Sequence, residues 1–141
     1  MKAIGLDFGA KTVGVALTDE TGSIARPVEI IRRDHEKRLR RTLARIESII
    51  EESHAELIVL GLPLNMDGSE GERTGKTKAF AEELQRRTGL SIIFQDERLS
   101  TVEAYEIMKM NGIRDREAQE KKIDGVAAAV ILQDYCNGKR G

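Results

Sequence analysis

Four acidic residues stand out because they occupy three positions where a charged side chain is unusual. Asp7 interrupts an otherwise apolar strand, although Asp disfavours strands and a buried, unpaired carboxylate is costly. Asp96 and Glu97 follow an apolar run, and Asp124 lies near the start of the most hydrophobic predicted helix. Each position has an ordinary explanation when taken alone: a turn contact, a solvated strand end or a favourable helix dipole. Together they place carboxylates on three separate elements.

Carboxylates in such a group suit hard divalent cations such as Mg²⁺ and Mn²⁺. Two such ions about 3.5–4 Å apart can activate a water and stabilise the leaving oxygen in phosphodiester cleavage. Asp96 and Glu97 alternate along a strand, so only one of them is expected at a shared site. The histidines and the single Cys136 form no cluster, which argues against zinc and excludes an internal disulfide. The pattern favours a divalent-cation site and leaves its second carboxylate open.

A basic stretch is the second candidate feature. Between positions 32 and 45 there are only two acidic residues and seven basic ones, namely Arg32, Arg33, Lys37, Arg38, Arg40, Arg41 and Arg45. A solvated helix face would explain them, but cations in the N-terminal half of a helix oppose its dipole. Contact with a phosphate backbone, for example through Arg38 and Arg41, is the functional alternative. Lys11 and Arg98 are candidates for holding a phosphate closer to the acids.

The composition is that of one globular domain, residues 1–141, with 40% hydrophobic and 33% charged residues. Aromatic residues make up only 4%, which predicts a core of aliphatic side chains. The net charge of −1 does not by itself indicate a nucleic-acid partner. No apolar run reaches the roughly 18 residues of a membrane span, and charges interrupt the first apolar segment. We therefore expect no membrane association and a cytoplasmic location.

The elements that must position these residues begin with an antiparallel meander, because the turns between its strands are short. Its strands are predicted at residues 2–8, 13–18 and 27–31. Apolar residues at helical spacing then predict an amphipathic helix over residues 36–52. A buried strand over residues 57–61 follows, and the polar, glycine-rich residues 63–75 are typical of a mobile loop.

The second half alternates helices and strands. A helix around Phe80 and Leu84 is expected to end at Gly89, followed by a fifth strand over residues 91–97. Ser100 and Glu103 fit a capping box at the start of a helix that Asn111-Gly112 would close. A final helix is predicted over residues 118–135. The order βββαβαβαα indicates an α/β fold, with helices packed on a five-stranded mixed sheet.

Four motifs, in this order along the chain, resemble the YqgF-type family. These are LDFGAKTVGVAL around Asp7, GLPLNMDGSEG at 61–71, DERLST at 96–101 and IDGVAAAVILQ at 123–133. The family comprises pre-16S rRNA nucleases that are also described as Holliday junction resolvase-like. The resemblance implies a ribonuclease H-like fold and hydrolysis of phosphodiester bonds with Mg²⁺ or Mn²⁺. It also implies a role in trimming the 5′ end of precursor 16S rRNA, as free RNA or within pre-ribosomal particles.

Carried over motif by motif, the resemblance implies that Asp7, Glu97 and Asp124 are the catalytic, metal-binding acids. Thr12 stands where the family often has Arg. The loop motif places Asn65, Asp67 and Ser69, with Gly68, where they could form a lid over the substrate.

The second carboxylate poses a geometric problem. In this fold the fourth strand usually lies beside the first, which puts Glu97 two strand spacings, about 9–10 Å, from Asp7. A Glu side chain and two metal ions could bridge that gap, but Asp96 or Asp67 could share the role. We rank Glu97 first, then Asp96, then Asp67.

Three alternatives to an rRNA nuclease follow from the same residues. An actin- or sugar-kinase-like phosphotransferase has a similar first hairpin, but it needs two such lobes, and 141 residues leave room for one. A Holliday junction resolvase acting on four-way DNA would require a dimer, with the region of Tyr105, Met108 and Met110 as a candidate seam. A non-catalytic RNA-binding assembly factor would keep the acids only for folding. We expect a monomer or a homodimer.

Overall fold

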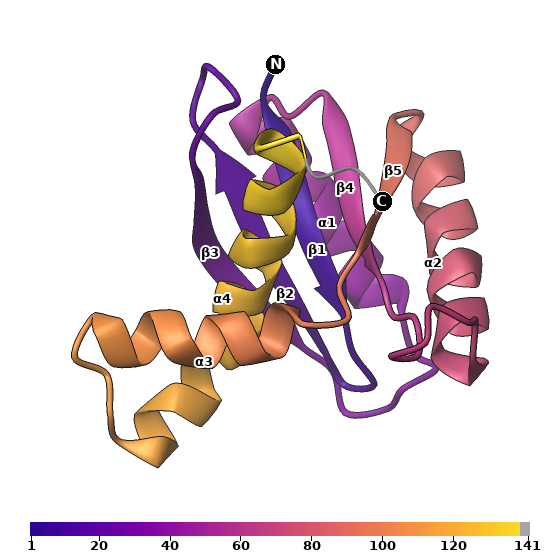
Figure 1. Ribbon diagram of the computed structural model, residues 1–141. Coiled ribbons are helices and arrows are strands. Elements are labelled where there is room, and N and C mark those ends of the chain that lie inside the picture. Colours follow the sequence, from indigo (N-terminus) through magenta and orange to yellow (C-terminus); the bar gives the residue numbers. More distant parts are fainter. Residues whose placement is uncertain (139–141) are drawn as a thin grey trace.

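The fold confirms the predicted order βββαβαβαα. The computed structural model describes residues 1–138 (Figure 1). Its elements are β1 (Ala3–Phe8), β2 (Thr12–Thr18), β3 (Ala25–Arg32), α1 (Arg40–Ser53), β4 (Leu57–Leu62), α2 (Glu72–Thr88), β5 (Ser91–Asp96), α3 (Ser100–Met110) and α4 (Arg116–Cys136).

The five strands form one mixed sheet in the order β3-β2-β1-β4-β5. The first three strands pair antiparallel, which confirms the predicted meander, whereas β4 and β5 run parallel to β1. The fourth strand therefore lies beside the first. As a result, the carboxyl ends of β1, β3, β4 and β5 all point to the same edge of the sheet.

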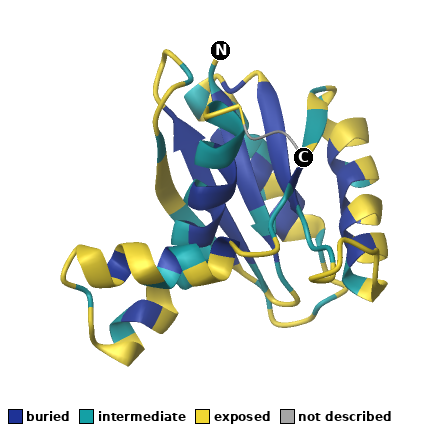
Figure 2. Cartoon of the chain, viewed as in Figure 1, coloured by how far each residue is buried: buried dark blue, intermediate teal, exposed yellow. Residues whose placement is uncertain are grey.

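The strands alternate between two packed faces because successive side chains of a strand point to opposite sides. On one face, Leu6 and Phe8 join a core with residues of α1 and α2, and the Phe8 ring stacks on Phe80 at 4.1 Å between centroids. On the other face, α4 lies across the sheet (Figures 1 and 2). Ala3 and Leu132 belong to the core cluster on this side. Asp7 alternates with Phe8 and is therefore on the α4 face.

Helix α1 begins at Arg40 and not at residue 36 as predicted. The preceding residues are held in a connecting segment, because the Arg33 guanidinium donates to the carbonyl of Gly9 at 2.7 Å and to that of Glu36 at 3.0 Å. Most of the basic stretch therefore precedes the helix. The basic residues that precede Arg40 therefore do not oppose the dipole of α1 from within its first turns, contrary to the prediction from the sequence.

One further boundary and one helix cap also differ from the prediction. The loop expected over residues 63–75 ends early, because the Thr74 hydroxyl donates to the carbonyl of Pro63 at 2.8 Å and α2 already begins at Glu72. The capping box at Ser100 is wrong, since Leu99 is the N-cap residue and has no side-chain cap. The Ser100 hydroxyl instead donates to the carbonyl of Glu97 at 2.9 Å.

Helix α4 is longer than predicted, with Asp115 as its N-cap. The Asp115 carboxylate accepts a hydrogen bond from the backbone amide of Ala118 at 3.1 Å. Asp124 consequently lies more than two turns inside the helix, beyond the reach of the favourable dipole at its N-terminus. No helix within residues 1–138 is both long and apolar enough to cross a membrane.

Candidate active site

Asp7 and Glu97 meet at the carboxyl edge of the sheet although they come from β1 and from the residue after β5. Their side chains share a hydrogen bond. Strand β4 lies between them, and Gly61 of β4 is the reason that the Glu97 side chain can cross it. A Cβ atom at Gly61 would lie 2.9 Å from Glu97 Cδ and 3.0 Å from Oε2. Because Gly61 has no side chain, the Glu97 side chain can reach Asp7 across two strand spacings.

Burial and mutual repulsion perturb both carboxyl groups. Burial raises the pKa of Asp7 to about 6; the hydrogen bond with Glu97 lowers this pKa, and the charge of Asp124 raises it. Burial and the nearby charge of Asp7 raise the pKa of Glu97 to about 9. Near neutral pH the pair therefore holds about one proton between two acidic side chains, and a bound cation would favour losing it.

Asp124 approaches the pair from α4. A Cβ at Gly14, the residue paired with Asp7 in the sheet, would lie 1.9 Å from the Asp124 carbonyl oxygen. The bare Gly14 backbone thus lets α4 contact the sheet at this point. Asp124 Oδ2 accepts a hydrogen bond from the Thr12 hydroxyl at 2.9 Å, which fixes its side chain beside the pair. In this chain Thr12 contacts an acid of the site.

The other two acidic candidates are engaged elsewhere. Asp96 binds the Arg98 side chain at 2.7 Å, and this contact helps to hold its pKa below the usual range despite partial burial. Asp67 Oδ1 accepts from the hydroxyl of Ser69 at 2.6 Å and from its amide at 2.9 Å. Neither side chain forms a hydrogen bond with Asp7 within residues 1–138. Of the three candidates for the second carboxylate, only Glu97 is brought against Asp7.

The predicted phosphate and lid residues lie around this edge. Lys11 is exposed in the β1–β2 turn. Arg98 is committed to Asp96 and also donates to the carbonyl of Met66 at 3.1 Å, which ties the loop before α2 to the end of β5. Asn65 Nδ2 donates to the Ser69 hydroxyl at 3.0 Å within this exposed loop.

Arg73 is a site neighbour that the sequence did not single out, because it falls in the segment predicted to be a loop. Its guanidinium donates to the Phe8 carbonyl and to Glu36, each at 3.0 Å. It is also the cation whose charge lowers the pKa of both Asp7 and Glu97. Only the early start of α2 brings it to the end of β1.

The contact between Asp7 and Glu97 fits a hard divalent cation, but the third carboxylate does not yet complete the site. Two partly buried carboxylates in contact, with raised pKa values, supply the oxygen ligands and the uncompensated charge that such an ion requires. Within residues 1–138, however, no three Asp, Glu, His or Cys side chains already form a group that could hold a metal. Asp7 and Glu97 are paired, whereas Asp124 is directed to Thr12.

The fold defines a class of protein. The chain has the ribonuclease H-like fold of T. thermophilus RuvC, which was solved in complex with a Holliday junction substrate; the TM-score is 0.63 at 13% identity, covering 100% of this chain and 97% of that one. The Fowlpox virus resolvase gives a TM-score of 0.59 at 15% identity and full coverage of both chains.

The sequence relationship is closer. Residues 1–138 match the RuvX family, described as Holliday junction resolvase, and the chain belongs to this family. A protein of Agathobacter rectalis named "Putative pre-16S rRNA nuclease" is 54% identical over 96% of this chain and 94% of its own length. One with the same name from Lachnospira eligens is 50% identical over 99% of both chains.

The Asp7–Glu97 proton gives a testable pH dependence. Because the pKa of Asp7 is raised to about 6 and that of Glu97 to about 9, a cation that binds both must displace about one proton between these values. The apparent affinity for Mn²⁺ should therefore rise about tenfold per pH unit from pH 6 to pH 9. Calorimetry in two buffers of different ionisation enthalpy would measure the released proton. An affinity that does not change with pH would contradict this arrangement.

The role of Gly61 is tested by Gly61→Ala. The new methyl group would lie 2.7 Å from Ile131 Cδ1 and 2.9 Å from Glu97 Cδ, so Glu97 should be displaced from Asp7. We expect Mn²⁺ affinity to fall at least about tenfold, with a stability loss of about 1–3 kcal/mol. Gly75→Ala is the matched control, because a Cβ there meets nothing within 4 Å. Unchanged Mn²⁺ affinity in Gly61→Ala would show that Glu97 does not need this passage.

Proposed function

We propose that this protein is a metal-dependent nuclease that hydrolyses phosphodiester bonds, with Asp7, Glu97 and Asp124 as its catalytic acids. The observation that carries the proposal is the partly buried contact of Asp7 and Glu97 across Gly61, at the edge where Asp124 also arrives. Two acidic side chains are not otherwise expected to lie in contact at a partly buried position, because the charge of each disfavours ionisation of the other. Membership of the RuvX family supports the same chemistry.

The metal ions would be Mg²⁺ or Mn²⁺, held by Asp7 and Glu97 with Asp124. When bound, they would activate the attacking water and stabilise the leaving oxygen. The chain's own contribution is to position these groups. Thr12 holds Asp124, Arg73 offsets part of the negative charge of the pair, and the bond from Arg73 to the Phe8 carbonyl fixes the end of β1.

Substrate contacts are proposed for the residues that surround this edge. Lys11 is exposed in the turn between β1 and β2, four residues after Asp7, and can contact a phosphate directly. Arg98 would act mainly by anchoring the loop of Asn65, Asp67 and Ser69, since its guanidinium is already bound to Asp96 and to the Met66 carbonyl. The loop is exposed and held by its own side-chain bonds, which suits a lid that covers the substrate.

The proposed substrate is precursor 16S rRNA, in 5′-end maturation during ribosome biogenesis. The relatives with 50% and 54% identity, whose name is "Putative pre-16S rRNA nuclease", support this choice. Such a role would place the protein in the cytoplasm, with free precursor RNA or pre-ribosomal particles as partner. It would require no second subunit, so a monomer suffices.

A second candidate is resolution of four-way DNA junctions, which the description of the RuvX family favours. A symmetric junction needs two sites, and therefore a homodimer. Of the three residues considered as a seam, Met108 is buried, whereas Met110 is 85% exposed. A dimer seam on α3 would consequently use Met110 and the exposed Ile107, and Met108 would support the helix from inside.

One experiment separates these functions. Labelled precursor rRNA, single-stranded RNA and a four-way DNA junction would each be incubated with Mn²⁺, Mg²⁺ or EDTA, using wild type beside Asp7→Asn. We expect cleavage that needs metal and is lost in the variant, with precursor rRNA preferred. Preference for the junction, together with a dimer by light scattering, would select resolution instead. Binding of RNA without cleavage under any condition would favour a non-catalytic assembly factor.

A further inference from the structure

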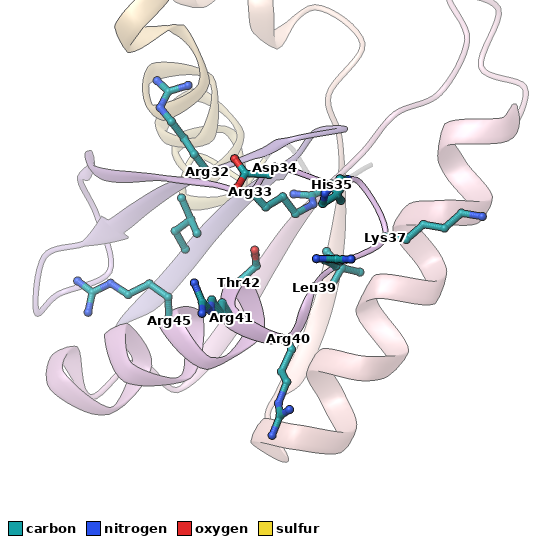
Figure 3. Close-up of a pocket in the computed structure, with 12 residues that line it drawn as sticks. Arg32, Arg33, Asp34, His35, Lys37, Leu39, Arg40, Arg41, Thr42 and Arg45 are labelled. Carbon is teal, nitrogen blue, oxygen red and sulfur yellow. The ribbon is translucent and has the colours of Figure 1, made fainter.

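A basic cavity of about 750 Å³ lies between the end of β3 and the start of α1 (Figure 3). Its lining comes from the last residues of β3, the connecting segment and the first turns of α1. Seven Arg and Lys side chains line it, while Asp34 is the one acid among its lining residues. The labelled charged groups extend in different directions around the cavity (Figure 3). This excess of positive charge indicates an anionic ligand.

Most of these cations have no carboxylate partner in the part of the chain that the structure describes. Within residues 1–138, no ion pair is formed by the side chains of Arg32, Lys37, Arg38, Arg40 and Arg41. The remaining two have structural roles, because Arg45 binds Glu29 at 2.7 Å and Arg33 binds the Gly9 carbonyl. Five unpaired cations around one hollow repel each other, and a polyanion would relieve that repulsion.

Glu36 explains how this basic segment is held against the rest of the protein. Its carboxylate binds Arg73 at 3.0 Å and Lys76 at 2.9 Å, both on α2, and this holds its pKa below the usual range. Glu36, the second acid of this basic segment, is thus turned toward α2 and is not among the lining residues of the cavity. It anchors the segment without neutralising the cavity.

The cavity and the acids share one edge of the sheet but lie toward opposite faces. Arg32 pairs with Thr12 in the sheet, and Arg33 donates to Gly9, two residues after Asp7. Yet Thr42 and Ile31 of the cavity belong to the side covered by α1, whereas Asp7 faces α4. A ligand that reaches both places must therefore pass around the edge of the sheet.

We propose that the basic cavity is a second binding site for the phosphate backbone of the nucleic-acid substrate, away from the bond that is cut. This inference rests on the proposed nuclease function and deepens it, because it makes the substrate a chain long enough to span both places. No Phe, Tyr or Trp is among the lining residues, so the contact is with phosphates and not with stacked bases. Binding should be independent of base sequence.

The test measures binding separately from cleavage. Fluorescently labelled single-stranded RNAs of about 4 and about 20 nucleotides would be titrated with Asp7→Asn protein in EDTA at several salt concentrations. The test protein also carries Arg38→Gln and Arg41→Gln. The control carries Arg26→Gln and Arg86→Gln instead, which removes the same charge from exposed positions near the opposite edge of the sheet.

For the long RNA we expect the Arg38/Arg41 variant to bind at least about tenfold more weakly, and the control to bind within about twofold of the parent. The slope of log affinity against log salt should fall by about 1.4, because each backbone contact with a single strand contributes about 0.7. The short RNA should bind all three proteins equally. A scrambled 20-nucleotide sequence should bind like the original.

In the binding experiment, any of three results would overturn the proposal: unchanged binding of the long RNA by the Arg38/Arg41 variant, equal weakening in the control, or equal weakening for the short RNA. The nuclease proposal fails on a different result, namely absence of metal-dependent cleavage by the protein with intact Asp7. If cleavage is present but independent of Arg38 and Arg41 on long substrates, the nuclease stands and the second site is wrong. If these arginines govern binding but nothing is cut, the second site stands and the nuclease is wrong.

Discussion

Asp7→Asn should abolish metal-dependent cleavage and, at the same time, make the metal-free protein more stable. The folded protein binds the Asp7 proton more tightly than the unfolded chain, because the pKa is raised from 3.8 to about 6. The stability due to this proton is fully present below about pH 4 and is lost as the pH rises through 6. At pH 8 the wild type therefore carries a buried charge that Asn removes.

The expected gain is about 1–3 kcal/mol at pH 8, since two pKa units correspond to at most about 3 kcal/mol. The melting temperature in EDTA should rise by roughly 3–10 °C, and the difference from wild type should vanish near pH 4. Excess Mn²⁺ should raise the melting temperature of the wild type but not that of the variant. Thermal unfolding followed by circular dichroism at both pH values would measure all three effects.

Asp96→Asn is the matched control, because it removes an acid next to Glu97 that binds Arg98 and not Asp7. It should retain cleavage and lose at most about 1 kcal/mol, as expected for a partly exposed ion pair. A metal-free Asp7→Asn protein that is less stable than wild type by 1 kcal/mol or more would contradict the site. Loss of cleavage in Asp96→Asn would return Asp96 to the site as second carboxylate.

Gly14→Ala should produce the largest loss of stability of any single methyl group added to the sheet near the site. The new Cβ would lie 1.9 Å from the carbonyl oxygen of Asp124 and 2.4 Å from its carbonyl carbon. These are backbone atoms of α4, so no side-chain rotation can relieve the clash. The helix must move away from the sheet, and Asp124 moves with it. We expect a loss of at least about 3 kcal/mol, measured by urea unfolding.

Gly75→Ala adds the same methyl group at a position within α2 where the new Cβ meets nothing within 4 Å. It should instead stabilise the protein by about 0.5–1 kcal/mol. This pair of variants separates the effect of the added methyl group from the effect of its surroundings. If Gly14→Ala folds with a loss below about 1 kcal/mol, α4 does not contact β2 as closely as the structure shows.

The sequence alone determined the order of the helices and strands, and it showed that Asp7 is an unusual charged residue within an apolar strand. Hydrophobic periodicity reports how each element is buried, and this information is local, so the order of strands and helices could be predicted and was confirmed. The helix starts at Arg40 and Glu72 were missed for a physical reason. They depend on contacts with the end of β1 or with Pro63, which no periodicity records.

The tertiary structure alone decided which acids meet. The family resemblance ranks Glu97 above Asp96, but strand alternation does not choose between them. The order β1-β4-β5, together with the absence of a side chain at Gly61, brings Glu97 against Asp7. Gly14 acts in the same way for Asp124. A glycine inside a strand does not change the hydrophobic periodicity of that strand, and the residue that it makes room for lies far away in the sequence. Arg73 and the basic cavity likewise depend on the packing of α2 and of the segment before α1, because long-range contacts fix their positions.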